Sequence, residues 1–497
     1  MNYVGTARPI HDAKGKATGY TKYAGDLSLP NMAYLCMLHS KIPHGYVKAV
    51  HAEKALALPG VYGVYHCLNT SDRKYNRYRS SFDQAYLANE ERAFNQYVRF
   101  VGDKIGAVAA CDQETAEKAA RLVEVEYEEL PFSIGFDDTF AGKNCLDGET
   151  PVRDEYTLEV GKKQESTEGL IEVCSTMELP RLHHATMETH ACIADYDPYI
   201  DMLTVYCPNQ AVHGIRTVLA DFLEMPESHV RVVKATMGGS FGAKQEWFLE
   251  PVTALVAKKL CRPVKLVYSR GEAMTDTIVR GAMRMSARGY YTPDGEMKEI
   301  YCDVTLDAGA YIGNAGDYVR ALAGKPTRCY RIPYMHYHGQ VISSNSPVSG
   351  AFRSWSAAEE ALMMERQLDA AAEKLGMDRL AIRLKNVARS GEEDKKLHLS
   401  LEDIRIGDAI TLGSEKFGWD KLKAEDAAFN ASQQRYRRGV GIGIGGHGNT
   451  YFPRFNDYGA GSISLNADGS MQANFTLHDH GCGTVTAMRM IAAEGHS

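Results

Sequence analysis

The sequence lacks several patterns that identify common classes of protein. Its eleven cysteines include no Cys-x-x-Cys pair, so neither a zinc site nor an iron–sulfur cluster is encoded locally. It has no basic run and a net charge of −7, which argues against nucleic acid or an anionic membrane as the main partner. No apolar run is long enough for a membrane span, and the N-terminal segment has no apolar stretch typical of a signal peptide. We therefore expect a cytoplasmic protein with reduced thiols.

The residues that are present predict a globular α+β protein. Apolar residues make up 44% and charged residues 24% of the 497, and such a chain is expected to hold about two to four domains. Short strands and helices alternate over residues 1–135, and longer α/β units follow over 169–395 and 396–497. Residues 136–168 and the charged stretch 390–435 are predicted to be linkers.

A glycine-rich segment from Gly238 to Gln245 follows a predicted β-branched strand. It superficially looks like a phosphate-binding loop, but Gln245 follows Lys244 where that loop carries Ser or Thr, so the magnesium-binding hydroxyl is missing. The pattern instead predicts a strand, a glycine turn with outward backbone N–H groups, and a helix N-terminus, which together hold anionic or oxo groups. For this segment alone, a simple tight turn is an equally good interpretation.

Two further glycine-rich segments lie near the end of the sequence. Gly443, Gly445 and Gly448 have the spacing of a dinucleotide-binding turn, but no helix is predicted after them, so residues 439–446 are interpreted as a closely packed strand. Segment 478–484 is predicted to expose backbone donors at the start of a helix. Its two histidines would share one side of a strand and suit a metal, yet without a third ligand nearby polar packing is the favoured interpretation.

Several short motifs occur together in an order that is typical of one family. They are Lys16-Ala17-Thr18-Gly19, Val101-Gly102-Asp103, Pro208-Asn209-Gln210, the segment Gly238 to Gln245, Gly350-Ala351-Phe352-Arg353 and Gly481-Cys482-Gly483. Each motif is weak alone, but the ordered set covers nearly the whole chain. It resembles the molybdenum-cofactor-binding chain of the xanthine dehydrogenase and aldehyde oxidase family. Cys482 departs from the pattern, because the family usually has Gln in that place.

The resemblance implies a domain order and a chemistry. A small hammerhead-like α/β domain, residues 1–135, would precede two molybdopterin-binding α/β domains. The first of these would cover 169–395 after the linker 136–168, and the second would begin at 396 and be incomplete. Family members hydroxylate an electron-poor carbon at a molybdenum centre held by a pterin, here expected as molybdopterin cytosine dinucleotide. An iron–sulfur subunit with [2Fe-2S] clusters and an FAD subunit are implied as partners, because neither cofactor has a motif in this sequence.

The motif positions imply which residues contact the cofactor. They are Gln210, Gly239, Ser240, Phe241, Gly242, Ala351, Phe352, Arg353, Gly481, Cys482 and Gly483. Among them Gln210, Phe241 and Arg353 are expected to contact ligands of the molybdenum. From the residues alone, Gln210 is more simply a helix-capping amide and Arg353 a surface ion-pair residue.

Three more residues are expected near the substrate by the same resemblance. Trp355 stands where the family often has an aromatic side chain that stacks on the substrate ring, and Arg320 where purine oxidisers support a substrate oxygen. A core tryptophan and a solvated arginine are the plain alternatives. Gln245 stands where animal purine oxidisers carry Glu, which fits a purine less well. The predicted substrate is a nitrogen heterocycle such as xanthine or hypoxanthine, with a nicotinate-like ring or an aldehyde as alternatives.

The family's catalytic base is a glutamate near the end of the full-length chain, so no catalytic residue is expected within this sequence. A separate partner chain is expected to supply the remaining molybdopterin domain, unless the sequence is a fragment. A noncatalytic remnant or assembly partner is the competing hypothesis. The stretch from His183 to His190 lacks the His-Glu-x-x-His order of a zinc site and is expected to be core or cleft lining.

Overall fold

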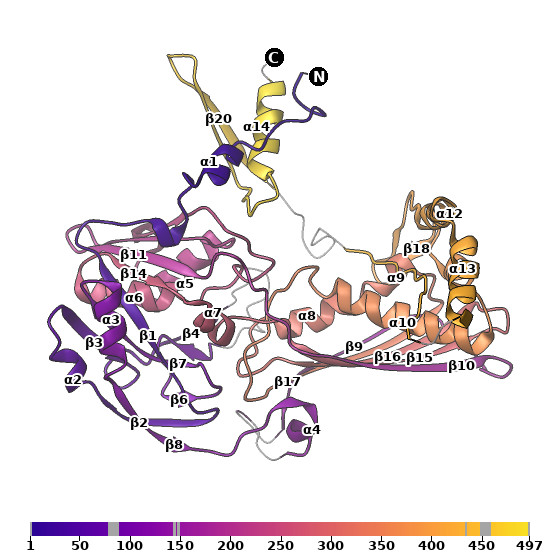
Figure 1. The fold of residues 1–497 in the computed structure, drawn as a ribbon, viewed down its shortest axis with the longest axis horizontal. Helices are drawn as coiled ribbons and strands as arrows, with labels where there is room; N and C mark the ends of the chain where they lie inside the picture. Colours follow the sequence, from indigo (N-terminus) through magenta and orange to yellow (C-terminus); the bar gives the residue numbers. More distant parts are fainter. Residues whose placement is uncertain are drawn as a thin grey trace.

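The computed structural model describes residues 2–77, 89–142, 146, 150–432, 435–447 and 459–495. Two large β-sheets, each with helices packed against it, make up most of the described chain (Figure 1). Smaller sheets of two or three strands flank them. This arrangement confirms the predicted mixed α+β architecture.

The first large sheet has seven strands, in the order β13-β12-β11-β14-β1-β7-β3. Their bounds are Val230–Lys234, Met202–Cys207, Ala191–Asp197, Val264–Val267, Ala33–His39, Lys104–Ala110 and Val61–His66. β1 runs parallel to β14, and β12 runs parallel to β13, whereas the other neighbours are antiparallel. Strands from the first 135 residues therefore share one sheet with strands from beyond residue 190.

The strands of this sheet form because one face of each is apolar. In β1, Leu35 and Met37 are buried in the first hydrophobic core, whereas the alternate residue Cys36 faces the other side and is half-buried. Helices α5 (Val212–Leu223) and α6 (Glu250–Leu260) cover the apolar face with their own buried residues.

The second large sheet has five strands, in the order β10-β15-β16-β17-β9. Their bounds are Ile171–Leu179, Ala282–Tyr291, Met297–Asp307, Tyr334–Ile342 and Val152–Gly161. The predicted hairpin around Pro293-Asp294-Gly295 joins β15 to β16. Helix α10 (Ala357–Leu375) lies across the sheet and buries Met363 and Leu368 in a second hydrophobic core (Figure 1).

The remaining elements are short or peripheral. The other strands are β2 (Gly45–His51), β4 (Lys74–Tyr75), β5 (Glu91–Arg92), β6 (Tyr97–Val98), β8 (Glu124–Glu129), β18 (Glu393–Asp394), β19 (Leu399–Ser400), β20 (Gly461–Leu465) and β21 (Met471–Phe475). The other helices are α1 (Ala13–Thr18), α2 (Glu53–Leu56), α3 (Gln113–Ala120), α4 (Gly135–Phe140), α7 (Arg270–Asp276), α8 (Ala315–Leu322), α9 (Pro326–Cys329), α11 (Arg379–Asn386), α12 (Ile406–Phe417), α13 (Trp419–Ser432) and α14 (Thr484–Glu494). Helix α14 lies beside the N-terminal segment, and Glu494 accepts hydrogen bonds from the amides of Asn2 and Tyr3 (Figure 1).

Both predicted linkers contain regular structure. The linker 136–168 is wrong for residues 152–161, which form β9 and pair antiparallel with β17 over their whole length. The stretch 390–435 includes α12 and α13. In both cases the exposed face carries many charged residues, so the segment has the composition of a loop although its backbone is hydrogen-bonded.

One further expectation differs from the structure. Residues 439–446 have no strand partner in the described part of the chain. Their apolar side chains Ile442 and Ile444 nevertheless pack against the second core, while Gly448 lies outside the described residues. The helix expected after the turn at 238–245 begins at Glu250 with Pro251 in its first turn, and Trp247 and Phe248 before it are buried in the first core. Among the helices described, none combines the length and apolar character needed to cross a membrane.

Candidate functional site

The glycine turn at 238–244 is held from behind by an ion pair. Lys244, almost fully buried, places Nζ 2.6 Å from Oε2 of Glu188. The same carboxylate oxygen accepts a 2.7 Å hydrogen bond from the amide of Gly238. Because its side chain is used in this way, Lys244 points into the protein, and the turn presents backbone groups on its other side.

The second predicted loop lies directly against this turn. Gly242 has φ +104°, and a Cβ built on it would lie only 2.3 Å from the carbonyl oxygen of Ala351. The amide of Arg353 donates a 2.8 Å hydrogen bond to the carbonyl of Phe241. Two segments more than a hundred residues apart, both predicted to face the cofactor, are therefore in contact, and this contact requires glycine at position 242.

Two buried histidines fix the backbone of both loops. Nε2 of His184 donates to the carbonyl of Ala351 at 2.7 Å, and Nε2 of His190 donates to that of Ala243 at 2.9 Å. Burial lowers the pKa of His184 to about 4 and that of His190 to about 3, so both rings are neutral at pH 7. A neutral ring that donates from Nε2 carries no proton on Nδ1, which sets the tautomer of both side chains. The expectation that this stretch lines a core or cleft agrees with these contacts.

Gln210 joins the turn to the third predicted segment. Its side-chain oxygen accepts a 2.6 Å hydrogen bond from the hydroxyl of Ser240. Its side-chain nitrogen donates to Nε2 of His478 at 3.0 Å, and its backbone amide donates to the carbonyl of Lys244 at 2.8 Å. Gln210 is thus a connecting residue at the site, not the cap of a helix.

The segment Gly481-Cys482-Gly483 uses its backbone donors internally. The carboxylate of Asp479 accepts hydrogen bonds from the amides of Gly481 (2.8 Å) and Gly483 (3.4 Å). Sγ of Cys482 lies 2.9 Å from the hydroxyl oxygen of Thr484, and this contact lowers the pKa of the exposed thiol. These glycine amides are therefore occupied by Asp479, unlike the outward-facing donors that the sequence predicts. Within the described residues, no group of three metal-ligating side chains includes His478 and His480.

The predicted substrate residues are placed differently from one another. Gln245 follows the turn and is half-buried, and its amide donates to the carbonyl of Gly242. Trp355 packs against Tyr318, with ring centroids 5.2 Å apart. Arg320 is bound by the carboxylate of Asp154 on β9, with one of its two contacts at 2.9 Å. Since that pair already satisfies much of its guanidinium, Arg320 can support a substrate only by sharing or leaving Asp154.

Glu246 is an acidic residue at the site that the sequence analysis missed. Its Oε1 accepts a 2.9 Å hydrogen bond from Asn314 and lies against Gly350. Burial raises the pKa of Glu246 to about 8, so it is mostly a neutral acid at pH 7. The only signal in the sequence is an acidic residue placed directly before the apolar run Trp247-Phe248-Leu249.

The outer side of the glycine turn is suited to an anionic or oxo group. The backbone amides of Gly239, Ser240 and Phe241 donate to no acceptor in the part of the chain that the structure describes. Gly239 has φ +96° and Phe241 has φ +54°, and a run of such residues forms a concave set of N–H donors. The phenyl ring of Phe241 is half exposed at the edge of this surface. The residues present therefore fit a cofactor that carries oxo or phosphate oxygens.

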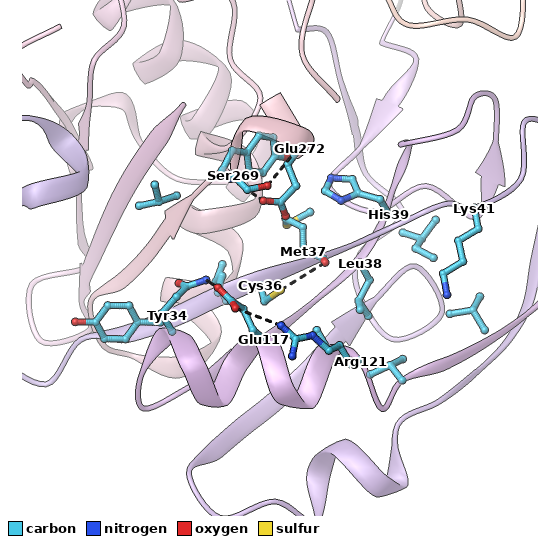
Figure 2. Close-up of a pocket in the computed structure, with 18 of the residues that line it drawn as sticks. Tyr34, Cys36, Met37, Leu38, His39, Lys41, Glu117, Arg121, Ser269 and Glu272 are labelled. Carbon is cyan, nitrogen blue, oxygen red and sulfur yellow. Dashed lines mark hydrogen bonds and ion pairs between the residues drawn. The ribbon is translucent and has the colours of Figure 1, made fainter. Parts of the chain in front are cut away.

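A cavity of about 1060 Å³ opens elsewhere, over β1 between α3 and α7. Figure 2 shows Cys36 at its floor, with the Glu117–Arg121 pair on one wall and Ser269 and Glu272 on the other. Burial raises the pKa of the Cys36 thiol to about 12, which makes it a poor nucleophile. None of the predicted site residues lines this cavity. The candidate site is therefore the surface formed by the loops.

Three known domain families match the chain. The a/b hammerhead domain of aldehyde oxidase and xanthine dehydrogenase matches residues 18–131. Molybdopterin cofactor-binding domains match residues 149–387 and 412–495. This order confirms the predicted fold class, in which a hammerhead domain precedes cofactor-binding domains.

Individual relatives support the same assignment. The chain is 29% identical over 496 residues to the xanthine dehydrogenase molybdenum-binding subunit of Escherichia coli O157:H7, covering 97% of this chain and 64% of that protein. It is 30% identical over 384 residues to the nicotinate dehydrogenase large molybdopterin subunit of Eubacterium barkeri, covering 76% of this chain and 88% of that one. Quinoline 2-oxidoreductase from Pseudomonas putida 86 has the same fold, with a TM-score of 0.87 at 22% identity over 98% of this chain and 64% of its own.

Proposed function

The chain belongs to the molybdopterin-binding large-subunit family of xanthine dehydrogenases and aldehyde oxidases, and from this premise we propose that it holds a molybdenum cofactor in an enzyme that hydroxylates a nitrogen heterocycle. The whole enzyme's activity is part of the proposal, because the chain spans only 64% of the xanthine dehydrogenase subunit it matches.

The contact between the two loops is the observation that carries this proposal. The turn at 238–242 and the segment 350–353 meet through Gly242 and Ala351, and both are fixed from behind by buried polar side chains. Such support holds backbone donors in place before a ligand arrives, so binding does not have to order them. Backbone donors held this firmly suit a cofactor whose orientation determines which substrate atom reacts.

The proposed cofactor is molybdopterin with molybdenum, in the cytosine dinucleotide form. The amides of Gly239, Ser240 and Phe241 would donate to its oxygen atoms, and the side chain of Gln210 would lie beside them. Arg353, which is exposed, would add positive charge on the opposite side. When bound, the cofactor supplies the hydroxylation and electron-transfer chemistry, and this chain's residues supply position and electrostatics. Gly481, Cys482 and Gly483 would contribute only if the Asp479 contacts rearrange.

A purine such as xanthine or hypoxanthine is the proposed substrate. Trp355 offers a flat aromatic side chain next to the Arg353 loop, and the molybdenum-binding relative from Escherichia coli is named for xanthine. A nicotinate-like ring is the second candidate, because the chain covers 88% of the nicotinate dehydrogenase large molybdopterin subunit. Gln245 at the turn also supports this second candidate, because animal purine oxidisers carry Glu in its place.

Partner chains complete the proposed enzyme. An iron–sulfur subunit with [2Fe-2S] clusters and an FAD subunit would accept the electrons, and a further segment or chain would supply the catalytic glutamate and the rest of the cofactor site. The competing possibility is a noncatalytic assembly partner, which would bind no molybdenum.

The test is turnover by the assembled complex. The chain is co-expressed with its partner chains, and purified complex is assayed with a dye acceptor against xanthine, hypoxanthine, nicotinate and an aromatic aldehyde. We expect hydroxylated purine with the highest kcat/KM, because purines match the proposed ring stacking at Trp355. A higher kcat/KM for nicotinate overturns the purine assignment. A purified complex that contains no molybdenum and hydroxylates no ring overturns the enzyme proposal.

A further inference from the structure

Three consecutive residues after Arg353 adopt left-handed backbone conformations. Ser354 has φ +78°, Trp355 φ +41° and Ser356 φ +65°, and none of them is glycine. Each such residue costs on the order of 1 kcal/mol or more, so a run of three persists only where the surroundings hold it. This left-handed turn, residues 354–356, leads directly into α10 and carries Trp355 at its centre.

Two cationic side chains donate to carbonyls at the turn and directly before it. Nζ of Lys325 donates to the carbonyl of Trp355 and, at 2.9 Å, to the hydroxyl of Ser356. Nη2 of Arg280 donates to the carbonyl of Arg353 at 2.9 Å, and its guanidinium lies 4.2 Å from the ring centroid of Phe352. These contacts come from outside the turn and stabilise a backbone that the three residues would not adopt alone.

The first turn of α10 supplies two acidic side chains beside these cations. Glu359 lies 2.9 Å from Nε of Arg280 and accepts a 3.0 Å hydrogen bond from the hydroxyl of Tyr318. Glu360 is almost fully buried near Lys325, and burial raises its pKa to about 8, so it is mostly a neutral acid at pH 7. Lys325 is only 8% exposed, and burying a lysine is costly unless its ammonium group is hydrogen-bonded. The acceptors of the turn are what satisfy this group.

The turn determines where the indole of Trp355 lies. Trp355 packs against both hydrophobic cores, and its ring meets that of Tyr318 at an interplanar angle of 56°. The hydroxyl of Tyr318 donates to Glu359, which also pairs with Arg280, so the position of the stacking partner is fixed independently of the turn. Release of the turn would therefore move the indole relative to this ring.

We propose that Lys325 is a positioning residue that holds the left-handed turn 354–356 and thereby presents Trp355 to a flat heterocyclic substrate. The claim that Trp355 faces a substrate rests on the proposed function, whereas the claim that Lys325 holds the turn does not. Lys325 touches no reacting atom and acts only through the carbonyl of Trp355 and the hydroxyl of Ser356.

The test replaces Lys325 with a side chain of similar length and no charge, K325M, in the full chain with its partners. Lys258→Met is the matched control, because Lys258 also donates to a backbone carbonyl, that of Leu223, but lies on α6. The chain has three tryptophans, so the emission of Trp355 is obtained in each background by subtracting the spectrum of the corresponding Trp355→Phe variant. We expect the Trp355 emission to shift to longer wavelength and become more quenchable by acrylamide in K325M only.

Kinetics separate positioning from a general structural role. In K325M the KM for the heterocycle should rise about tenfold while kcat changes less than about twofold, because a stacking contact of this size is lost without change in the reacting groups. Ser356→Ala removes one acceptor of Lys325 and should give the same changes in smaller measure, which keeps the test decisive if K325M does not fold. Unchanged Trp355 emission in the folded variants overturns the claim that Lys325 holds the turn. A shifted emission with unchanged KM overturns its role toward substrate, and neither result depends on whether the purine assignment holds.

Discussion

Neutral buried side chains fix the loops of the site at the scale of single residues. His184 and His190 each donate one hydrogen bond to a loop carbonyl, and Glu246 lies against Gly350 of the second loop. Because burial keeps all three uncharged near pH 7, they position the backbone without placing a net charge behind the proposed cofactor. For the two histidines the cost of this arrangement appears when the pH falls, whereas for Glu246 it is smaller at lower pH.

Acid should destabilise the chain through its buried histidines. The unfolded chain binds protons at these histidines below about pH 6.5, whereas the folded chain takes them up only near pH 4 for His184 and pH 3 for His190. The contribution of each histidine to stability is therefore fully present above pH 6.5 and is lower by about 2 kcal/mol at pH 5. Glu246 acts in the opposite direction, because its raised pKa lets the folded chain keep a proton that the unfolded chain loses above about pH 4.5. The histidine contribution is therefore measured as the difference between wild type and a His190 variant in how the urea unfolding midpoint changes from pH 7 to pH 5.

His190→Gln keeps an amide donor near the position of Nε2 and should show a smaller loss between pH 7 and pH 5 than the wild type. His51→Gln is the control, since His51 is exposed and its pKa is raised by Glu126. An equal loss in His190→Gln and wild type would contradict the neutral buried histidine.

The family resemblance predicts part of this site. It indicates Gln210, the glycine turn and the Ala351 loop, because these lie in motifs that occur in a fixed order along the chain. The sequence does not indicate Glu188, Glu246 or Lys325, whose importance comes from partners far away in sequence. A buried acidic residue or lysine is the same residue type as a solvated one, so the sequence does not distinguish them and only the fold decides which is buried.

At the scale of elements, edge strands are the hardest elements to predict from the sequence. β9 pairs with β17 on one side only, and its exposed residues are Glu155, Thr157, Glu159 and Gly161, so its composition resembles that of a polar linker. Its end depends on Gly161, which has φ +79° and whose added Cβ would lie 1.8 Å from the carbonyl oxygen of Pro333. β7 of the first sheet is predicted better, because it lies between β1 and β3 and is buried along its whole length.

Gly161→Ala should destabilise the second sheet. Gly169→Ala is its matched control, since Gly169 has φ +78° and nothing within 4 Å of an added Cβ. The two variants share the backbone strain of about 1 kcal/mol, and only the first adds a clash with Pro333, so its thermal midpoint should fall clearly further. Equal midpoints in the two variants would contradict the close approach of β9 to the Pro333 backbone.

At the scale of the whole molecule, the site lies where the two large sheets meet. The turn at 238–242 follows β13 of the first sheet, and the loop at 350–353 leads from the second sheet into α10. Trp355 packs against both hydrophobic cores at this junction. The sequence orders these loops correctly but cannot bring them together, because their contact results from how two sheets pack. Likewise, the sequence does not show that β1, β3 and β7, which come from residues 1–135, pair with strands of the next domain in the first sheet.

The most direct test of the account is the molybdenum content of the purified complex, measured by elemental analysis for wild type, Gly242→Ala and Gly418→Ala. Gly418 has φ +75° and open space around it, so its variant controls for backbone strain. We expect equimolar molybdenum in wild type and Gly418→Ala. Gly242→Ala should lose most of its molybdenum, because the added Cβ separates the two loops, while its circular dichroism spectrum stays unchanged. Absence of molybdenum from the wild-type complex, or full retention of molybdenum in Gly242→Ala, would contradict the claim that these loops hold the cofactor.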